Sequence, residues 1–136
     1  MTTVNRHIGK VTLLVKDYDE AIQWYRDKLN FTLIEDKPLP EQGGKRWVTM
    51  APDSRSTFQL LLAKASTEHQ SQFIGNQSGG RVFLFLYTTN FSQDYSAFLS
   101  NGVEFIREPE SHSYGMVAVF QDLYGNLWDL IEPIIE

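Results

Sequence analysis

The stretch VAVFQDLYGNLWDLIE, residues 117–132, predicts the end of a β-sheet domain. Two alternating apolar runs flank a turn built from Asp122, Gly125 and Asn126, which is typical of a β-hairpin. The second run is apolar on both faces except at Asp129. Because burying an unpaired charge costs roughly several kcal/mol, Asp129 is expected to have a partner or to face a cavity.

The composition predicts one globular domain, residues 1–136. The chain is 42% hydrophobic and 13% aromatic, enough for a real core but not for two. Its net charge of −5 and its lack of a basic run argue against nucleic acid as a partner. No segment approaches the roughly 20 apolar residues of a membrane span, so we expect a cytoplasmic protein without membrane contact.

The same order of elements occurs twice along the chain. One half covers about residues 7–63 and the other about 81–133, with a polar connector at 64–80 that has room for a turn of helix. Asp17 and Asn90 begin the two helices, each followed three residues later by Glu or Gln, as in a capping box. Strands are expected at 8–15, 31–35, 46–50, 57–63, 81–88, 103–106, 116–120 and 127–131.

Each half is therefore a βαβββ module, and the predicted fold class is α+β. One module cannot bury both faces of its sheet, because its helix covers only one of them. Two modules side by side are expected to form a curved eight-strand sheet around a cleft, with the helices outside.

Several local motifs support this architecture. They are V-K-D followed by A-I-x-W-Y-x-x-x-L-x-F in the first half, N-G-V-E-F after the second helix, and D-x-x-G-N-x-W-D-L at the end. With these motifs the chain resembles the vicinal oxygen chelate (VOC) superfamily, the glyoxalase, bleomycin resistance protein and extradiol dioxygenase fold. The resemblance covers almost the whole chain and implies a fold more than a substrate.

The resemblance also implies where a metal would bind. Members that hold one use His or Glu on the first, fourth, fifth and eighth strands, and the matching positions here are Lys10, Gln59, Phe83 and Asp129. Only Asp129 is a normal metal ligand. We therefore expect no metal cofactor. Two interpretations of Lys10 and Asp129 stay open: a charge pair inside the cleft, or contact with a ligand.

The three histidines keep a divalent metal as an alternative. His7 precedes the first strand, His69 lies in the connector, and His112 lies in a Ser-containing loop. A metal site would use Asp129 together with His7 or His112. The chain would then be an enzyme, a glyoxalase-like lyase or isomerase or a dioxygenase of the dihydroxybiphenyl dioxygenase type, as the resemblance implies.

Strand parity, the family positions and one loop aromatic select the candidate ligand-binding residues. They are Lys10, Thr12, Trp47, Gln59, Phe83, Phe85, Tyr114 and Asp129. Apolar side chains with a few polar groups are typical of small-molecule pockets. For Trp47 and Phe83 a place in the core or at a dimer interface is an equal alternative.

The resulting hypothesis is a small-molecule binding protein that resembles bleomycin resistance proteins, without the family metal site. The resemblance implies a homodimer with clefts completed at the interface. The alternatives are the metal-dependent enzyme that uses Asp129 and a regulatory or interaction domain whose cleft is closed by side chains. Whether the chain is catalytic, and which ligand it takes, stay open at this point.

Overall fold

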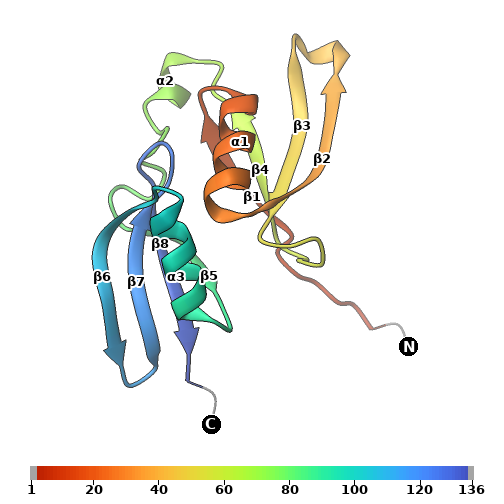
Figure 1. The fold of residues 1–136 in the computed structure, drawn as a ribbon. Helices are drawn as coiled ribbons and strands as arrows, with labels where there is room; N and C mark the ends of the chain where they lie inside the picture. The colour runs from red at the N-terminus through yellow and green to blue at the C-terminus, as the bar shows by residue number, and fades with distance from the viewer. Residues whose placement is uncertain (1–2, 135–136) are drawn as a thin grey trace.

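The structure is a computed structural model that describes residues 3–134 of the 136-residue chain (Figure 1). The first half contains β1 (Lys10–Val15), α1 (Tyr18–Leu29), β2 (Thr32–Leu39), the 3-10 turn η1 (Pro40–Gln42), β3 (Lys45–Ala51) and β4 (Gln59–Lys64). A short helix, α2 (Glu68–Ser71), lies in the connector. The second half contains β5 (Val82–Tyr87), α3 (Phe91–Ser100), β6 (Glu104–His112), β7 (Gly115–Gln121) and β8 (Leu127–Pro133).

The strands form two four-stranded sheets. Sheet A has the order β1-β4-β3-β2, and sheet B has the order β5-β8-β7-β6. The first and last strands of each module pair in parallel, with Lys10 opposite Gln59 in sheet A and Phe85 opposite Asp129 in sheet B. The predicted α+β class with two βαβββ modules is confirmed. The eight strands are shared between two hydrogen-bonded sheets of four.

The two main helices begin where their capping residues predicted. The Asp17 carboxylate accepts a hydrogen bond from the Glu20 backbone N–H at 2.8 Å, and the Asn90 amide oxygen accepts one from Gln93 at 3.1 Å. Helix α1 ends at Leu29 and is capped by Asn30, which has the left-handed φ of 57° expected at such a position. Within residues 3–134 no helix is both long and apolar enough to cross a membrane.

Two strands run further than the sequence predicted, because each passes through a proline. Strand β2 continues through Pro38, and β6 continues through Pro109. Proline lacks a backbone N–H and is normally excluded from the middle of a sheet. Both strands lie at the outer edge of their sheet, so this missing donor leaves the neighbouring strand's pairing intact.

One hydrophobic core joins the modules. The Trp128 ring of β8 lies 6.0 Å from the Tyr25 ring of α1 and 5.9 Å from the Phe31 ring, measured between centroids. The Tyr25 hydroxyl also donates a hydrogen bond to the buried carboxylate of Asp122 at 2.6 Å. The β7–β8 turn that dominated the sequence pattern therefore also fastens the second module to the helix of the first.

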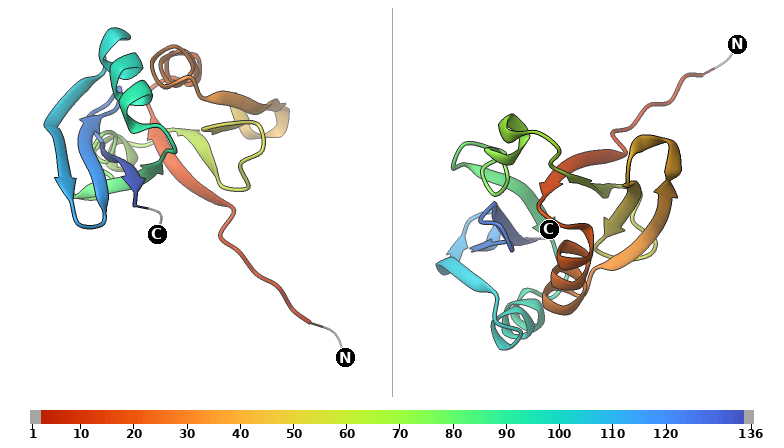
Figure 2. Two further views of the ribbon diagram at one scale, coloured as in Figure 1. Left: turned by 60° about the horizontal axis from the view of Figure 1, so that its bottom comes forward. Right: turned by 90° about the horizontal axis from the view of Figure 1, so that it is seen from above.

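Two hydrogen bonds between Lys28 and Asn101 join the C-terminal ends of helices α1 and α3, where the two helices approach each other (Figure 2). The helix-bearing faces of both sheets contribute to the common core. The opposite faces carry exposed side chains, among them Thr12 in sheet A and Phe85 in sheet B. Within one chain, the residues predicted to share a cleft therefore lie on two separate sheet faces.

Candidate functional site

The first candidate site is a cavity of about 510 Å³ at sheet A, which we call the sheet A cavity. Strands β1, β3 and β4 and the connector line it. Its lining residues are Thr12, Leu14, Tyr18, Leu39, Lys45, Arg46, Trp47, Leu61, Leu62, Ala63, Lys64, Ser66, Gln70 and Gln77. The volume is within the range of small-molecule sites, about 300–1,000 Å³.

The Trp47 ring is held in place by a carboxylate that the sequence interpretation missed. The Trp47 indole N–H donates to Oε1 of Glu35 at 3.1 Å, and the Thr49 hydroxyl donates to the same oxygen at 3.4 Å. The Lys37 ammonium lies 3.2 Å from the other carboxylate oxygen. The hydrogen bonds from Trp47 and Lys37 lower the pKa of Glu35, so this carboxylate is ionised at neutral pH.

Strand pairing explains why Glu35 escaped sequence analysis. In the β2–β3 pair, Glu35 is opposite Thr49 and Lys37 is opposite Trp47, with a register shift after Leu33. The loop between the expected strands contains prolines and glycines and does not specify this register. The alternation of Glu35 and Lys37 was the only local signal that both side chains share a face.

The connector supplies one wall of the sheet A cavity through Gln77. The Gln77 side-chain oxygen accepts from the Leu14 backbone N–H, and its NH₂ group donates to the Thr12 carbonyl at 2.8 Å. The amide thus pairs with the open edge of β1 much as a neighbouring strand would. The Gln77 backbone N–H donates to the Asn126 side chain at 3.2 Å, which holds the connector against the β7–β8 turn.

The second candidate site is a cavity of about 470 Å³ at sheet B, the sheet B cavity. Asp129 and Tyr114 both line it, as do Arg107 and His112. Burial raises the pKa of Asp129 above its usual value, and the positive charge of Arg107 opposes this shift. The Tyr114 ring stacks on His112 with a centroid distance of 5.1 Å at the rim formed by the β6–β7 hairpin.

The predicted charge pair between Lys10 and Asp129 is wrong within one chain. Lys10 is exposed on β1 of sheet A, whereas Asp129 lies on β8 of sheet B with Arg107 as the charge that acts on its pKa. Among residues 3–134 no salt bridge joins Lys10 to Asp129. The prediction failed because it assumed that both sheets contribute to one cleft.

The other candidate residues are divided in the same way. Thr12 and Trp47 line the sheet A cavity, while Gln59 lies opposite Lys10 and has a buried side-chain oxygen without a hydrogen-bond partner among the described residues. Phe83 packs against the core. Phe85 is 55% exposed and is the strand partner of Asp129, so the fifth-strand residue beside Asp129 is two positions later than expected.

The side chains at the family metal positions do not fit a metal ion. They are an ammonium, an amide, a phenyl ring and one carboxylate, and a bound divalent ion normally has three or four N, O or S ligands. In the described part of the chain no three His, Asp or Glu side chains form a group that could hold a metal. His112, which the sequence offered as a metal ligand beside Asp129, has its Nε2 atom 3.3 Å from Oε2 of Glu110.

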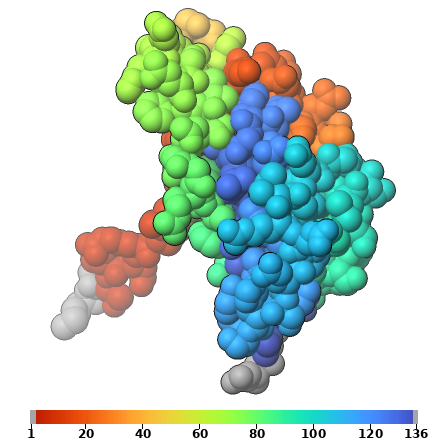
Figure 3. All heavy atoms as spheres, turned by 90° about the vertical axis from the view of Figure 1, so that its left-hand side faces the viewer, coloured from red at the N-terminus to blue at the C-terminus, as the bar shows by residue number. Residues whose placement is uncertain are grey.

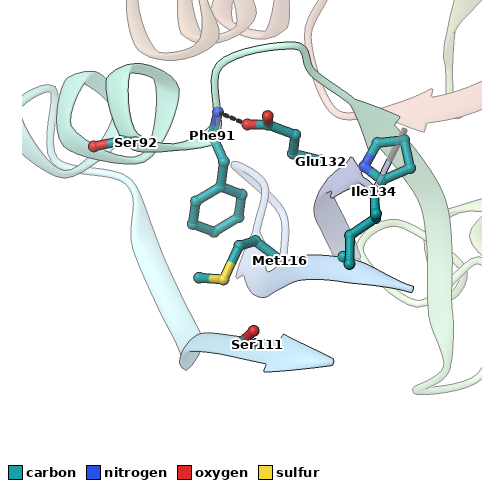
Figure 4. A pocket seen from close by; sticks show the side chains of 8 residues that line it. Phe91, Ser92, Ser111, Met116, Glu132 and Ile134 are labelled. Carbon is teal, nitrogen blue, oxygen red and sulfur yellow. Dashed lines mark hydrogen bonds between the residues drawn. The ribbon is translucent and has the colours of Figure 1, made fainter. Parts of the chain in front are cut away.

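A third cavity of about 460 Å³ lies at the start of α3 (Figure 4). Phe91, Met116 and Ile134 supply its apolar walls. The Glu132 carboxylate accepts a hydrogen bond from the Phe91 backbone N–H at 2.6 Å, so it already serves the helix N-terminus. None of the sequence-predicted ligand residues lines this cavity.

Comparison with known proteins decides the family. The family model of the Glyoxalase/Bleomycin resistance protein/Dioxygenase superfamily matches residues 7–130. The chain belongs to this superfamily. The resemblance inferred from the motifs is therefore confirmed.

Similar proteins match this chain over almost its full length. An uncharacterized protein of Shewanella frigidimarina (strain NCIMB 400) is 52% identical over 129 residues, which is 95% of each chain. The crystal structure of UcmS2 has a TM-score of 0.80 at 27% identity and covers 94% of this chain and 98% of its own. TnmS3, an antibiotic binding protein from Streptomyces sp. CB03234, has a TM-score of 0.78 at 24% identity, covering 98% and 100%.

Proposed function

We propose that this chain is a small-molecule binding protein of the cytoplasm that works without the family metal and holds its ligand in the sheet A cavity. The observation that carries the proposal is the Trp47 ring, which lines a cavity of about 510 Å³ and is oriented by Glu35. An aromatic ring held in place by a hydrogen bond offers contact area at little entropic cost on binding.

The remaining lining of the sheet A cavity suits the same role. Apolar contact comes from Leu14, Leu39 and Leu61, while Thr12 and Gln70 add a few hydrogen-bonding groups. Such a ratio of apolar to polar groups is usual in ligand sites. TnmS3 is described as an antibiotic binding protein, and a ligand taken up without chemical change is the corresponding proposal for this chain.

We further propose that two copies form a homodimer in which the second copy covers the open face of sheet B. Phe85 and Tyr87 on this face are 55% and 65% exposed, and β5 is an edge strand. Exposed apolar edge strands are normally covered. Residues 3–9 project from the body of the molecule with Val4 and Ile8 exposed, which adds apolar surface for a partner (Figure 3).

The first test measures metal content of protein purified without chelator or affinity tag, followed by thermal shifts with a small-molecule library. A ligand that binds only the native state raises the melting temperature by mass action. We expect no stoichiometric metal and at least one organic ligand with a clear shift. Near-stoichiometric metal would contradict the proposal and return attention to Asp129.

The second test uses the Trp47→Ala variant with any ligand found in that screen. Removing the ring should weaken binding at least about tenfold, because aromatic contacts dominate such sites. Tyr114→Ala serves as the control, since Tyr114 is an exposed aromatic residue of the other cavity. Equal losses in both variants, or none in either, would place the ligand elsewhere.

A further inference from the structure

We infer that the sheet A cavity selects an aromatic small molecule that carries an anionic group, such as a carboxylate or a sulfonate. This inference rests on the proposed binding function and names the ligand class. It follows from the charges that line the cavity, from the state of each of these charges, and from a comparison with the matching cavity of the second module.

The charged residues that line the sheet A cavity are all basic. They are Lys45, Arg46 and Lys64, and within residues 3–134 no Asp or Glu lines the cavity. This local composition is opposite to that of the whole chain, whose net charge is −5. A concave site lined by one sign of charge concentrates ligands of the opposite sign, because the surrounding protein focuses its field.

Arg46 is already neutralised by neighbouring acids. Its guanidinium lies 2.7 Å from Asp36 and 3.0 Å from Asp19, and its central carbon is 5.1 Å from the Tyr18 ring centroid. These contacts fix the guanidinium and hold the Tyr18 ring at the cavity wall. Arg46 is therefore a positioning residue, and its charge is not available to a ligand.

Lys45 and Lys64 differ from Arg46 in this respect. Both are exposed, and among residues 3–134 neither has a carboxylate within 4.0 Å. Lys45 is the first residue of β3, and Lys64 is the last residue of β4. The two lysines therefore stand at adjacent ends of the antiparallel β3–β4 pair, and both line the cavity together with Trp47. An anionic group of a bound aromatic molecule would be attracted there.

The second module shows that the fold does not impose this charge pattern. Its cavity at the start of α3 uses the matching element ends, with Gly115 where β7 begins and Pro133 where β8 ends. Among the residues that the structure describes, no Lys or Arg lines that cavity, and the charged lining residue is the acidic Glu132. The basic cavity is thus a property of the first module's own side chains.

The test compares two dyes that have the same rings. Anilinonaphthalenesulfonate carries a sulfonate, and phenylnaphthylamine lacks it. Affinities are measured by fluorescence titration for the wild type, for Lys45→Gln/Lys64→Gln, and for Arg6→Gln/Arg26→Gln. The last variant also loses two positive charges, but at exposed positions outside the cavity lining. Trp47→Leu reports whether either dye occupies the cavity.

We expect the lysine variant to bind the sulfonate dye about fivefold or more weakly, and the neutral dye with unchanged affinity. The arginine control should change neither affinity by more than about twofold, and added salt should weaken only the sulfonate dye. If Trp47→Leu weakens both dyes but the lysine variant does not distinguish them, the anion inference is overturned and the binding function stands. If Trp47→Leu changes neither affinity, the dyes do not bind in the cavity. The anion inference and the proposed binding function are then both overturned.

Discussion

Removing the Asp122 carboxylate should destabilise the fold more than any single change at the surface. This side chain is 4% exposed and accepts hydrogen bonds from three side chains, the Tyr25 hydroxyl, the Asn126 amide and the Trp128 indole, at 2.6, 3.1 and 3.3 Å. It also accepts the backbone N–H groups of Gly125 and Asn126 in the turn. Asp122→Ala leaves several of these buried donors without an acceptor.

The cost can be worked out from these contacts. Each buried donor left unsatisfied costs about 1–3 kcal/mol, and breaking a buried charged network costs about 3–5 kcal/mol in total. For a domain of 136 residues this corresponds to a melting temperature lower by about 10–17 °C. Differential scanning calorimetry and urea unfolding measure both quantities.

A double-mutant cycle tests the reasoning directly. Tyr25→Phe alone should cost about 1.5–3 kcal/mol, because its hydroxyl donates to a charged acceptor. In the Asp122→Ala background the same change should cost almost nothing, since the acceptor is gone. Independent, additive losses in the two single variants would refute the claim that this contact joins the modules. So would a loss below about 1 kcal/mol for Asp122→Ala.

The same pair predicts how stability depends on alkaline pH. Burial, with the nearby Asp122 charge, raises the pKa of Tyr25 well above its usual value. The folded state therefore keeps its proton when the unfolded chain has lost it. The contribution of Tyr25 to the free energy of unfolding is fully present below about pH 10. It falls as the pH rises from there toward the folded pKa. Tyr25→Phe should remove this part of the alkaline loss.

Two further predictions concern backbone and charge. Gly75→Ala should cost several kcal/mol, roughly, because Gly75 has φ +75° and an added Cβ would lie 1.8 Å from the Tyr124 carbonyl oxygen. Gly79→Ala is the control, with φ +67° and open space, and should cost only about 1 kcal/mol; equal losses in urea unfolding would contradict the contact. For Asp129 the raised folded pKa means that stability is present below the unfolded pKa and is lost as the pH rises through the folded pKa. The urea midpoint of Asp129→Asn should therefore rise relative to that of the wild type as the pH increases from 3 to 7. A midpoint below that of the wild type at pH 7 would contradict this.

Local patterns were sufficient to predict the elements and their repeat. The capping residues Asp17 and Asn90 begin the two helices through hydrogen bonds from the backbone N–H groups three residues later. From Leu127 to Leu130, β8 alternates half-buried and buried positions, as the pleat of a strand predicts. Where the prediction failed, at Pro38 and Pro109, the missing information was which strands lie at the edges of the sheets.

The candidate site was predicted only in part, because its residues meet through long-range contacts. Trp47 could be assigned to a ligand-facing position from strand parity, but its partner Glu35 depends on the β2–β3 register. Gln77 is 63 residues from Leu14, and no local pattern relates them.

The sequence by itself determined the two βαβββ modules, their turns and the apolar faces that must be buried, since these depend on periodicity and nearest neighbours along the chain. Only the tertiary structure decided that the helix-bearing faces meet in one core around Trp128. That packing separates Lys10 from Asp129 and leaves the basic and aromatic side chains together at sheet A. The physical reason is that burial of the largest apolar area selects the arrangement of the modules, and the polar groups take the positions that remain.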